Sequence, residues 1–149
     1  MRIALAADEL TGIASTLPEQ LRARGHELLL HGAYTGDERA DWAWASQRAA
    51  LDVATGSADQ AVVACWTGTG ASIAANKVAG VRAALCADAQ TAEGARRWND
   101  ANVLALSLRA TSEAELTEIL DAWLTTSASM DETDARNISH LTAIEQGRD

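Results

Sequence analysis

The sequence is poor in several residue types. Its 149 residues include no Phe, one Pro and two Cys. Without Phe, the core has to be built mainly from Ala, Leu, Val and Ile, which supply most of the 48% hydrophobic content. The two cysteines, Cys65 and Cys86, could pair in principle, but free thiols are the default state in a reducing cytosol. We therefore expect an aliphatic core and no structural disulfide.

Positive charge and long apolar runs are also scarce. Twelve Lys and Arg against 21 Asp and Glu give a formal net charge of −9, whereas phosphate binding by nucleic-acid-binding proteins needs an excess of clustered Lys and Arg. No apolar run approaches the roughly 18 residues of a membrane span, and the opening segment 1–8 is too short for a signal peptide. We expect a soluble, cytoplasmic protein with neither a nucleic-acid nor a membrane partner.

The apolar pattern predicts a single α/β domain over residues 1–149. Short apolar runs bounded by turn residues alternate with segments of helical period, as in βαβ units. This alternation predicts a doubly wound, open, five-stranded parallel sheet of the Rossmann-like or flavodoxin-like class, with its core in residues 1–124. The predicted strands are Arg2–Ala7, Glu27–Leu30, Gln60–Cys65, Ala83–Cys86 and Val103–Leu106, and the predicted helices lie near 15–24, 41–55, 71–77, 89–98 and 113–124.

The last part of the chain, residues 125–149, separates from this alternation. Residues 125–134 are polar and predict a linker, and residues 135–146 predict a short helix. Such an isolated helix can pack on a neighbouring subunit or cover its own sheet, and the sequence leaves both open.

In an open parallel sheet, ligands bind beyond the carboxyl ends of the strands, near the switch in strand order. The candidate site residues are therefore those that follow each predicted strand. They are Asp8 and Glu9, the loop 34–44, the segment 65–72 and Arg109. Trp98 and Asn99, at the end of a helix, could also reach this rim.

The segment from Cys65 to Ser72 joins a buried strand to a helix and has the sequence CWTGTGAS. Backbone N–H groups at such a junction can bind an anion or oxyanion. A tight turn that needs Gly for positive φ is the simpler explanation of Gly68 and Gly70. The presence of Cys65 favours a functional site over a simple turn, because a thiolate near a helix N-terminus is stabilised and can act as a base or nucleophile.

The run from Cys65 to Lys77, CWTGTGASIAANK, resembles the signature of the type B ribose-5-phosphate isomerase and galactose-6-phosphate isomerase family. The resemblance continues through 80–86, 99–106 and 121–124, so it covers nearly the whole chain. It implies a doubly wound sheet, a homodimer or tetramer with the active site at the subunit interface, a small-molecule substrate, and no metal or organic cofactor.

The resemblance also implies roles for single residues. Cys65 would remove the proton α to a sugar carbonyl, with Thr67 as a proton-relay or orienting hydroxyl. The turn would stabilise the enediolate, and proton abstraction beside a carbonyl does need both a base and preorganised donors. The matching residues are Gly68, Thr69, Gly70 and Ser72 for the oxyanion cradle, Asp8 and Asn99 for sugar hydroxyls, and Arg109 and Arg136 for the phosphate side.

Several positions depart from the family pattern. Glu9 follows Asp8 where the family usually has a substrate-binding histidine. Trp98 replaces a histidine thought to open the sugar ring, and an indole cannot shuttle that proton. Trp66 stands where Gly is usual, and three carboxylates now surround Arg136 in the segment 130–136. The predicted site is thus less cationic than that of the family.

Four of the five tryptophans fall in segments that line the family's cleft: Trp42, Trp44, Trp66 and Trp98. A single Trp more often fills a core gap, as we expect for Trp123, but four together favour a hydrophobic pocket. Such a pocket suits a larger, less charged substrate than a pentose phosphate, for instance a deoxygenated, aromatic or ring-open compound.

Three functions remain open on these residues. The first is an aldose–ketose isomerase with an altered, less charged or non-phosphorylated substrate. The second is a proton-transfer isomerase or epimerase of a biosynthetic pathway outside sugar metabolism, and the third is a non-catalytic partner subunit of a two-chain isomerase. We expect the histidines to be structural or surface residues, and Cys86 to be a core residue on the strand beside that of Cys65.

Overall fold

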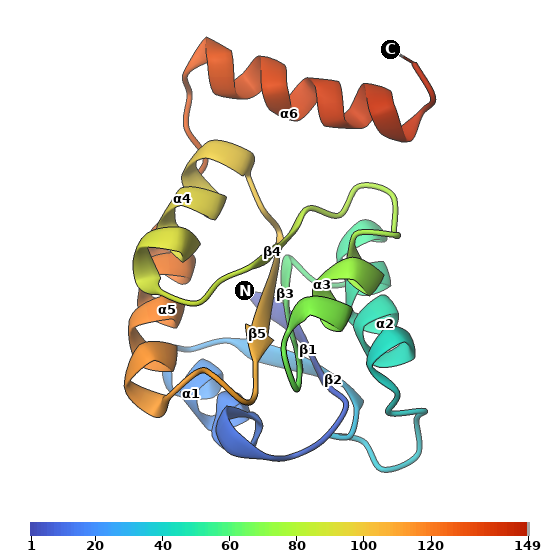
Figure 1. Ribbon diagram of the computed structural model, residues 1–149, viewed down its shortest axis with the longest axis vertical. Coiled ribbons are helices and arrows are strands. Elements are labelled where there is room, and N and C mark those ends of the chain that lie inside the picture. The colour runs from blue at the N-terminus through green and yellow to red at the C-terminus, as the bar shows by residue number, and fades with distance from the viewer. Residues whose placement is uncertain (149) are drawn as a thin grey trace.

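A five-stranded parallel sheet is the central layer of the protein, seen in a computed structural model that describes residues 1–148 (Figure 1). The strand order is β2-β1-β3-β5-β4, and every neighbouring pair is parallel. The predicted doubly wound α/β class is therefore confirmed. The elements are β1 (Arg2–Ala7), η1 (Gly12–Ser15), α1 (Leu17–Ala23), β2 (Glu27–Gly32), α2 (Trp42–Ala54), β3 (Gln60–Cys65), α3 (Thr69–Ala75), β4 (Ala83–Leu85), α4 (Ala89–Asn99), β5 (Val103–Ser107), α5 (Glu113–Thr125) and α6 (Glu132–Glu145).

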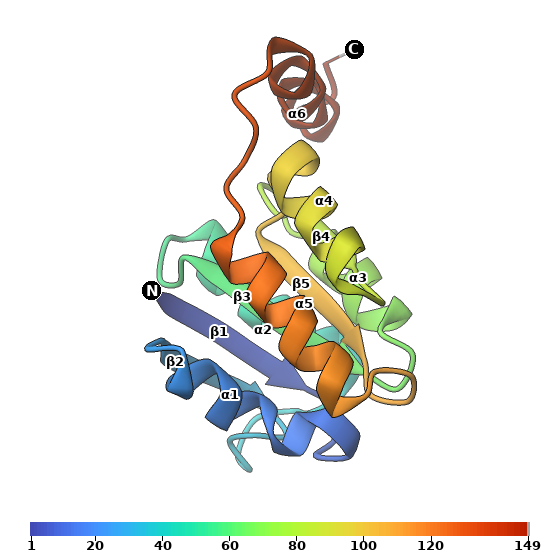
Figure 2. The ribbon, with the colours of Figure 1, turned by 90° about the vertical axis from the view of Figure 1, so that its left-hand side faces the viewer.

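Helices cover both faces of the sheet (Figure 2). On one face α1, α4 and α5 pack against side chains such as Ile3 and Leu5 of β1, and on the other α2 and α3 pack against Ala4 and Ala6. The period-2 alternation of a strand explains this division. The core between the sheet and helices α2 and α3 consists almost entirely of Ala and Val, so these two helices can lie close to the sheet.

Trp123 lies in the core between the sheet and helices α1, α4 and α5, and is a core residue as predicted. Its ring is fully buried, and its Nε1–H donates a hydrogen bond of 2.7 Å to the side-chain oxygen of Gln60. The indole polar atom is thereby satisfied inside the core, as a buried tryptophan requires.

Cys86 is not beside Cys65, so the predicted adjacency of their strands is wrong. β5 lies between β3 and β4, and Cys86 itself follows the end of β4. The sequence pattern does not determine on which side of an earlier strand a parallel crossover returns. Cys86 is nevertheless a buried core residue, as expected, and burial raises the pKa of its thiol to about 12.

Helix α6 begins at Glu132, three residues before the predicted start at Ala135. The difference arises because Asp131 caps the helix, accepting a 2.8 Å hydrogen bond from the Thr133 N–H. None of the side chains of α6 is buried, and the helix lies beyond the amino-terminal edge of the sheet (Figure 1). The alternative in which it covers its own sheet is therefore not what the structure shows. No helix among residues 1–148 is long and apolar enough to span a bilayer.

Candidate active site

The switch in strand order lies between β1 and β3, because the chain passes from β1 to β2 on one side and returns to β3 on the other. Ala7 pairs with Ala64 in the parallel register, so Asp8 and Cys65 follow at the carboxyl ends of adjacent strands. A cavity of about 300 Å³ lies at this point. Its seven lining residues, all among the predicted site residues, are Asp8, Trp42, Cys65, Trp66, Thr67, Thr69 and Gly70.

The turn from β3 to α3 depends on Gly68. Its φ of 75° lies in the left-handed region, and a Cβ there would come within 2.8 Å of the backbone carbonyl carbon of Leu106. A side chain would therefore be strained and would also clash. This geometry brings the chain from the buried Cys65 directly into the first turn of α3.

Two of the backbone N–H groups in the predicted oxyanion cradle are already hydrogen-bonded within the chain. The Gly68 N–H donates to the Cys65 carbonyl at 3.1 Å, and the Ser72 N–H donates to the Gly68 carbonyl at 3.0 Å. Both are thus used inside the turn. Among residues 1–148 no backbone acceptor pairs with the N–H groups of Thr69 and Gly70, as is usual in the first turn of a helix. These two N–H groups are the backbone donors of the cradle that can still bind an oxyanion.

Cys65 and two hydroxyls form the polar side of the cavity. Cys65 is a free cysteine and is only 5% exposed. The hydroxyls of Thr67 and Thr69 lie 2.7 Å apart, and either can donate to the other. The pair can pass a proton along, because a hydroxyl both donates and accepts.

Asp8 contributes a carboxylate that is partly removed from water. Burial is the main cause that raises the pKa of Asp8, and the neighbouring charge of Glu9 raises it further. The Oδ1 atom is buried and has no hydrogen-bond partner within residues 1–148. Glu9, by contrast, is exposed and does not line the cavity.

The predicted pocket of four tryptophans is reduced to two within one chain. A Cβ on Gly70 would lie 2.9 Å from Trp42 Cε3, so this ring packs directly on the glycine, and Trp66, 54% exposed, forms a second wall. Trp44 is elsewhere, 3.5 Å from the Arg39 guanidinium. Positions two apart on a helix point about 200° apart, so Trp42 and Trp44 cannot share one pocket.

Arg109 lies on the far side of Thr67. The two residues line a neighbouring cavity of about 240 Å³ together with Ser107 and Cys86. The Arg109 N–H donates to the Trp66 carbonyl at 3.0 Å, which fixes the backbone there, while its side chain makes no ion pair with the rest of chain 1–148. A cation therefore adjoins the Cys65 cavity but does not line it.

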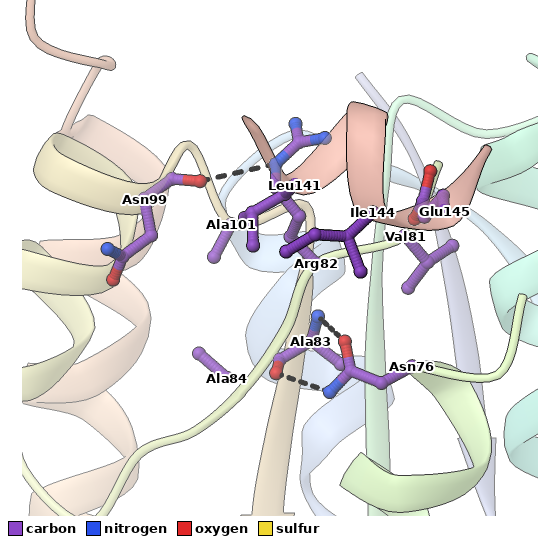
Figure 3. Close-up of a pocket in the computed structure, with 10 residues that line it drawn as sticks. All are labelled: Asn76, Val81, Arg82, Ala83, Ala84, Asn99, Ala101, Leu141, Ile144 and Glu145. Carbon is purple, nitrogen blue, oxygen red and sulfur yellow. Dashed lines mark hydrogen bonds between the residues drawn. The ribbon is translucent and has the colours of Figure 1, made fainter. Parts of the chain in front are cut away.

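Trp98 and Asn99 do not reach the rim that carries Cys65 in the same chain, so the possibility that they do so within one subunit is excluded. Helix α4 ends at Asn99, shortly before β5 starts, and a helix that returns antiparallel to the strands ends at their amino-terminal edge. Asn99 lines a cavity of about 360 Å³ beside Leu141 and Ile144 of α6 (Figure 3). Arg136 is also on α6 and therefore lies at the amino-terminal edge of the sheet.

The histidines are outside the Cys65 cavity, as expected. His31 is held between two carboxylates, with Nε2 at 2.7 Å from Asp52 and Nδ1 at 3.1 Å from Glu38. This group of three interacting side chains was not apparent from the sequence, because its members come from β2, the following loop and α2. Within the described part of the chain, no cluster of His, Cys, Asp or Glu is arranged to hold a metal ion.

A doubly wound parallel sheet with a cavity at its switch point, lined by a cysteine, a carboxylate and two hydroxyls, has the architecture of an α/β enzyme. Residues 3–141 match the ribose/galactose isomerase family, and the chain belongs to that family. It is 39% identical over 125 residues to ribose-5-phosphate isomerase B of Escherichia coli K12, covering 84% of this chain and 83% of that protein. It is 37% identical over 125 residues to galactose-6-phosphate isomerase subunit LacB of Clostridium acetobutylicum, covering 83% and 72%.

Solved structures agree with this assignment. The structure of ribose-5-phosphate isomerase B from Clostridium thermocellum superposes with a TM-score of 0.90 at 31% identity, over 99% of each chain. The protein is thus an isomerase, and its relatives act on more than one sugar phosphate by name.

Proposed function

We propose that the protein is an aldose–ketose isomerase in which Cys65 transfers a proton between the two carbons of an enediolate. The observation that carries this proposal is the meeting of Cys65, Asp8 and the free N–H groups of Thr69 and Gly70 in one cavity. A base beside preorganised donors is what proton abstraction next to a carbonyl requires. Thr67 orients the substrate or relays protons at the mouth of the cavity.

The charge of the cavity favours a substrate that is less anionic than a pentose phosphate, or not phosphorylated. Its lining includes Asp8 but no Lys or Arg, and Glu9 is the next residue along the chain. A phosphate in this cavity would lie near the Asp8 carboxylate with no cation of the same chain lining the cavity, so it would be repelled. Trp42 and Trp66 add apolar surface, so the site supports a substrate with an apolar or deoxygenated portion. Any remaining anionic group would point across Thr67 towards Arg109.

The second edge of the sheet supports an active site shared between subunits. Trp98, Asn99 and Arg136 lie at the edge opposite to Cys65, so only another copy of the chain can bring them to that cavity. The exposed side chains of Leu141 and Ile144 on α6 suit an interface between two copies. A symmetric dimer would then place each α6 against its partner and complete two equivalent sites.

The test is deuterium exchange from D2O, followed by NMR, with phosphorylated and free aldoses and ketoses and small α-hydroxy ketones. The wild type is compared with Cys65→Ala and with Cys86→Ala, a matched variant of the other buried cysteine. The proposal expects exchange that Cys65→Ala abolishes and Cys86→Ala retains. Exchange confined to non-phosphorylated compounds supports the altered substrate, whereas equal exchange with ribose 5-phosphate contradicts it.

Absence of deuterium exchange with every compound would contradict the proposal that the protein is a sugar isomerase. It would favour one of the other two functions, a proton-transfer enzyme acting on a different class of compound or a partner subunit. Addition of a second family member from the same cell separates these two, because a partner subunit gains activity only in the mixture.

A further inference from the structure

Asp8 is the second titratable residue that lines the Cys65 cavity, and its carboxylate makes no ion pair with the described part of the chain. Its Oδ1 atom is buried and accepts no hydrogen bond from residues 1–148. A buried acceptor without a partner costs free energy that a folded protein normally avoids. Such an atom inside a reaction cavity is satisfied when a substrate hydroxyl donates to it.

We propose that Asp8 is a catalytic residue that carries a proton between the two oxygens of the enediol while Cys65 carries the proton between the two carbons. The role rests on the proposed isomerase function and adds a second acid–base group to it. It gives Asp8 more than the hydroxyl-binding role that the family resemblance implies.

The isomerisation balances with these two groups alone. In an open-chain aldose, Cys65 thiolate removes the proton from C2, and the electrons of that C–H bond form the C1=C2 double bond while O1 becomes the oxyanion. Asp8 carboxylate then accepts the proton of the O2 hydroxyl and delivers a proton to O1. Cys65 returns its proton to C1 as the C2=O bond forms. One proton has moved from C2 to C1 and one from O2 to O1, and no oxidant or reductant is needed.

No other group in the cavity can hold the oxygen-bound proton as well. Thr67 and Thr69 have hydroxyls that donate and accept, but neither becomes a stable anion near neutral pH. The remaining lining side chains are two indoles and a glycine. Burial raises the pKa of Asp8, which brings the carboxyl closer to the substrate oxygens in acidity and favours transfer in both directions.

The experiment separates movement of the carbon-bound proton from net isomerisation. D-ribose 5-phosphate, D-erythrulose 4-phosphate and free D-erythrulose are incubated in D2O, and NMR measures deuterium in the recovered substrate and in the product. The variants are Asp8→Asn, which is isosteric but cannot ionise, Asp8→Glu, which keeps the acid, and Cys65→Ala. Glu118→Gln, on the exposed face of α5, removes one negative charge elsewhere.

In Asp8→Asn, net isomerisation should fall by about 100-fold or more, the usual contribution of an acid–base group, while Cys65-dependent exchange into the substrate falls by less than about tenfold. Asp8→Glu should recover part of the loss, and Glu118→Gln should behave as the wild type. The low-pH decline of the isomerisation rate should be shallower in Asp8→Asn than in the wild type, because only the contribution of the Asp8 carboxylate is removed. Glu9 and Cys65 are the titratable groups that adjoin Asp8, and both remain in this variant.

Other results overturn the role of Asp8. If Asp8→Asn lowers exchange and isomerisation equally, the carboxylate only holds a hydroxyl, and if it lowers neither, the carboxylate is idle. Both outcomes leave Cys65 chemistry intact. Absence of exchange in the wild type with all three probes would instead contradict the proposed function itself, and this role with it. Thermal unfolding of each variant identifies any loss that is due to misfolding.

Discussion

Burial makes the charge of Asp8 unfavourable for folding. Its pKa is raised above the ordinary 3.8 in the folded state, so the folded state binds the proton more tightly than the unfolded state. Stability then falls as the pH rises from the unfolded pKa through the folded one. We predict that Asp8→Asn has a free energy of unfolding at pH 7 at least equal to that of the wild type, and that any gain vanishes below about pH 3. Urea denaturation at the two pH values tests this, and a less stable variant at pH 7 contradicts it.

Gly70 and Trp42 give a second prediction for single residues. A Cβ at Gly70 would lie 2.9 Å from the ring of Trp42, so Gly70→Ala should displace the indole at a cost of about 1–3 kcal/mol. With Trp42→Leu in place, the same change should be neutral or stabilising by up to about 1 kcal/mol, because Ala favours a helix over Gly. A double-mutant cycle in urea measures the coupling, and equal effects in both backgrounds would show that the ring does not press on Gly70.

Sequence reasoning at the residue scale predicted which side chains line the cavity at the switch point, but not all of their neighbours. Cys65, Thr67 and Asp8 were predictable because the carboxyl ends of adjacent parallel strands must meet at one edge of the sheet. The separation of Trp44 from Trp42 was not, because it depends on which face of α2 packs on the sheet. The buried, unpaired oxygen of Asp8 likewise depends on atoms from several elements.

Helix α5 owes its start to a capping box. The Ser112 hydroxyl accepts from the Glu115 N–H at 3.2 Å, and the Glu115 carboxylate accepts from the Ser112 N–H at 2.8 Å. The hydrogen bonds from Ser112 lower the pKa of Glu115. We predict that Ser112→Ala lowers the free energy of unfolding by about 1 kcal/mol at pH 7. Ser127→Ala, an exposed serine after α5, is the control, and equal stability of the two variants in urea would contradict the prediction.

Element boundaries were predictable where local chemistry marks them. Gly25, with a φ of 82°, ends the first helical segment as its sequence position indicates. The early start of α6 at Asp131 was missed, because an acidic residue in a polar segment resembles a linker until its carboxylate is seen to cap the helix. The strand order beyond β3 was also beyond reach, since adjacent crossovers of either direction satisfy the same alternating pattern.

At the scale of the whole molecule, the residues matched to one active site are split between two edges of the sheet. Asp8 and Cys65 lie at the carboxyl ends of β1 and β3, whereas Asn99 ends α4 and Arg136 belongs to α6. Figure 1 shows α6 beside the end of α4, at the opposite edge of the sheet. A family resemblance assigns residues to a site without saying which chain supplies them. The structure of one chain shows this division, because a side chain at one edge of the sheet is too short to reach the opposite edge in any rotamer.

This division predicts complementation between two inactive variants. If Asn99 binds substrate in the partner's cavity, a hybrid dimer of Cys65→Ala and Asn99→Ala contains one intact site and one doubly damaged site. Random mixing makes half of the dimers hybrid, so coexpression should restore about a quarter of the wild-type isomerisation rate. Coexpression of Cys65→Ala with Asp8→Asn should restore none, because those residues share one cavity of one chain and every site in the hybrid stays damaged. Restoration in the second pair, or in neither pair, would mean that the active site is not divided between subunits in this way.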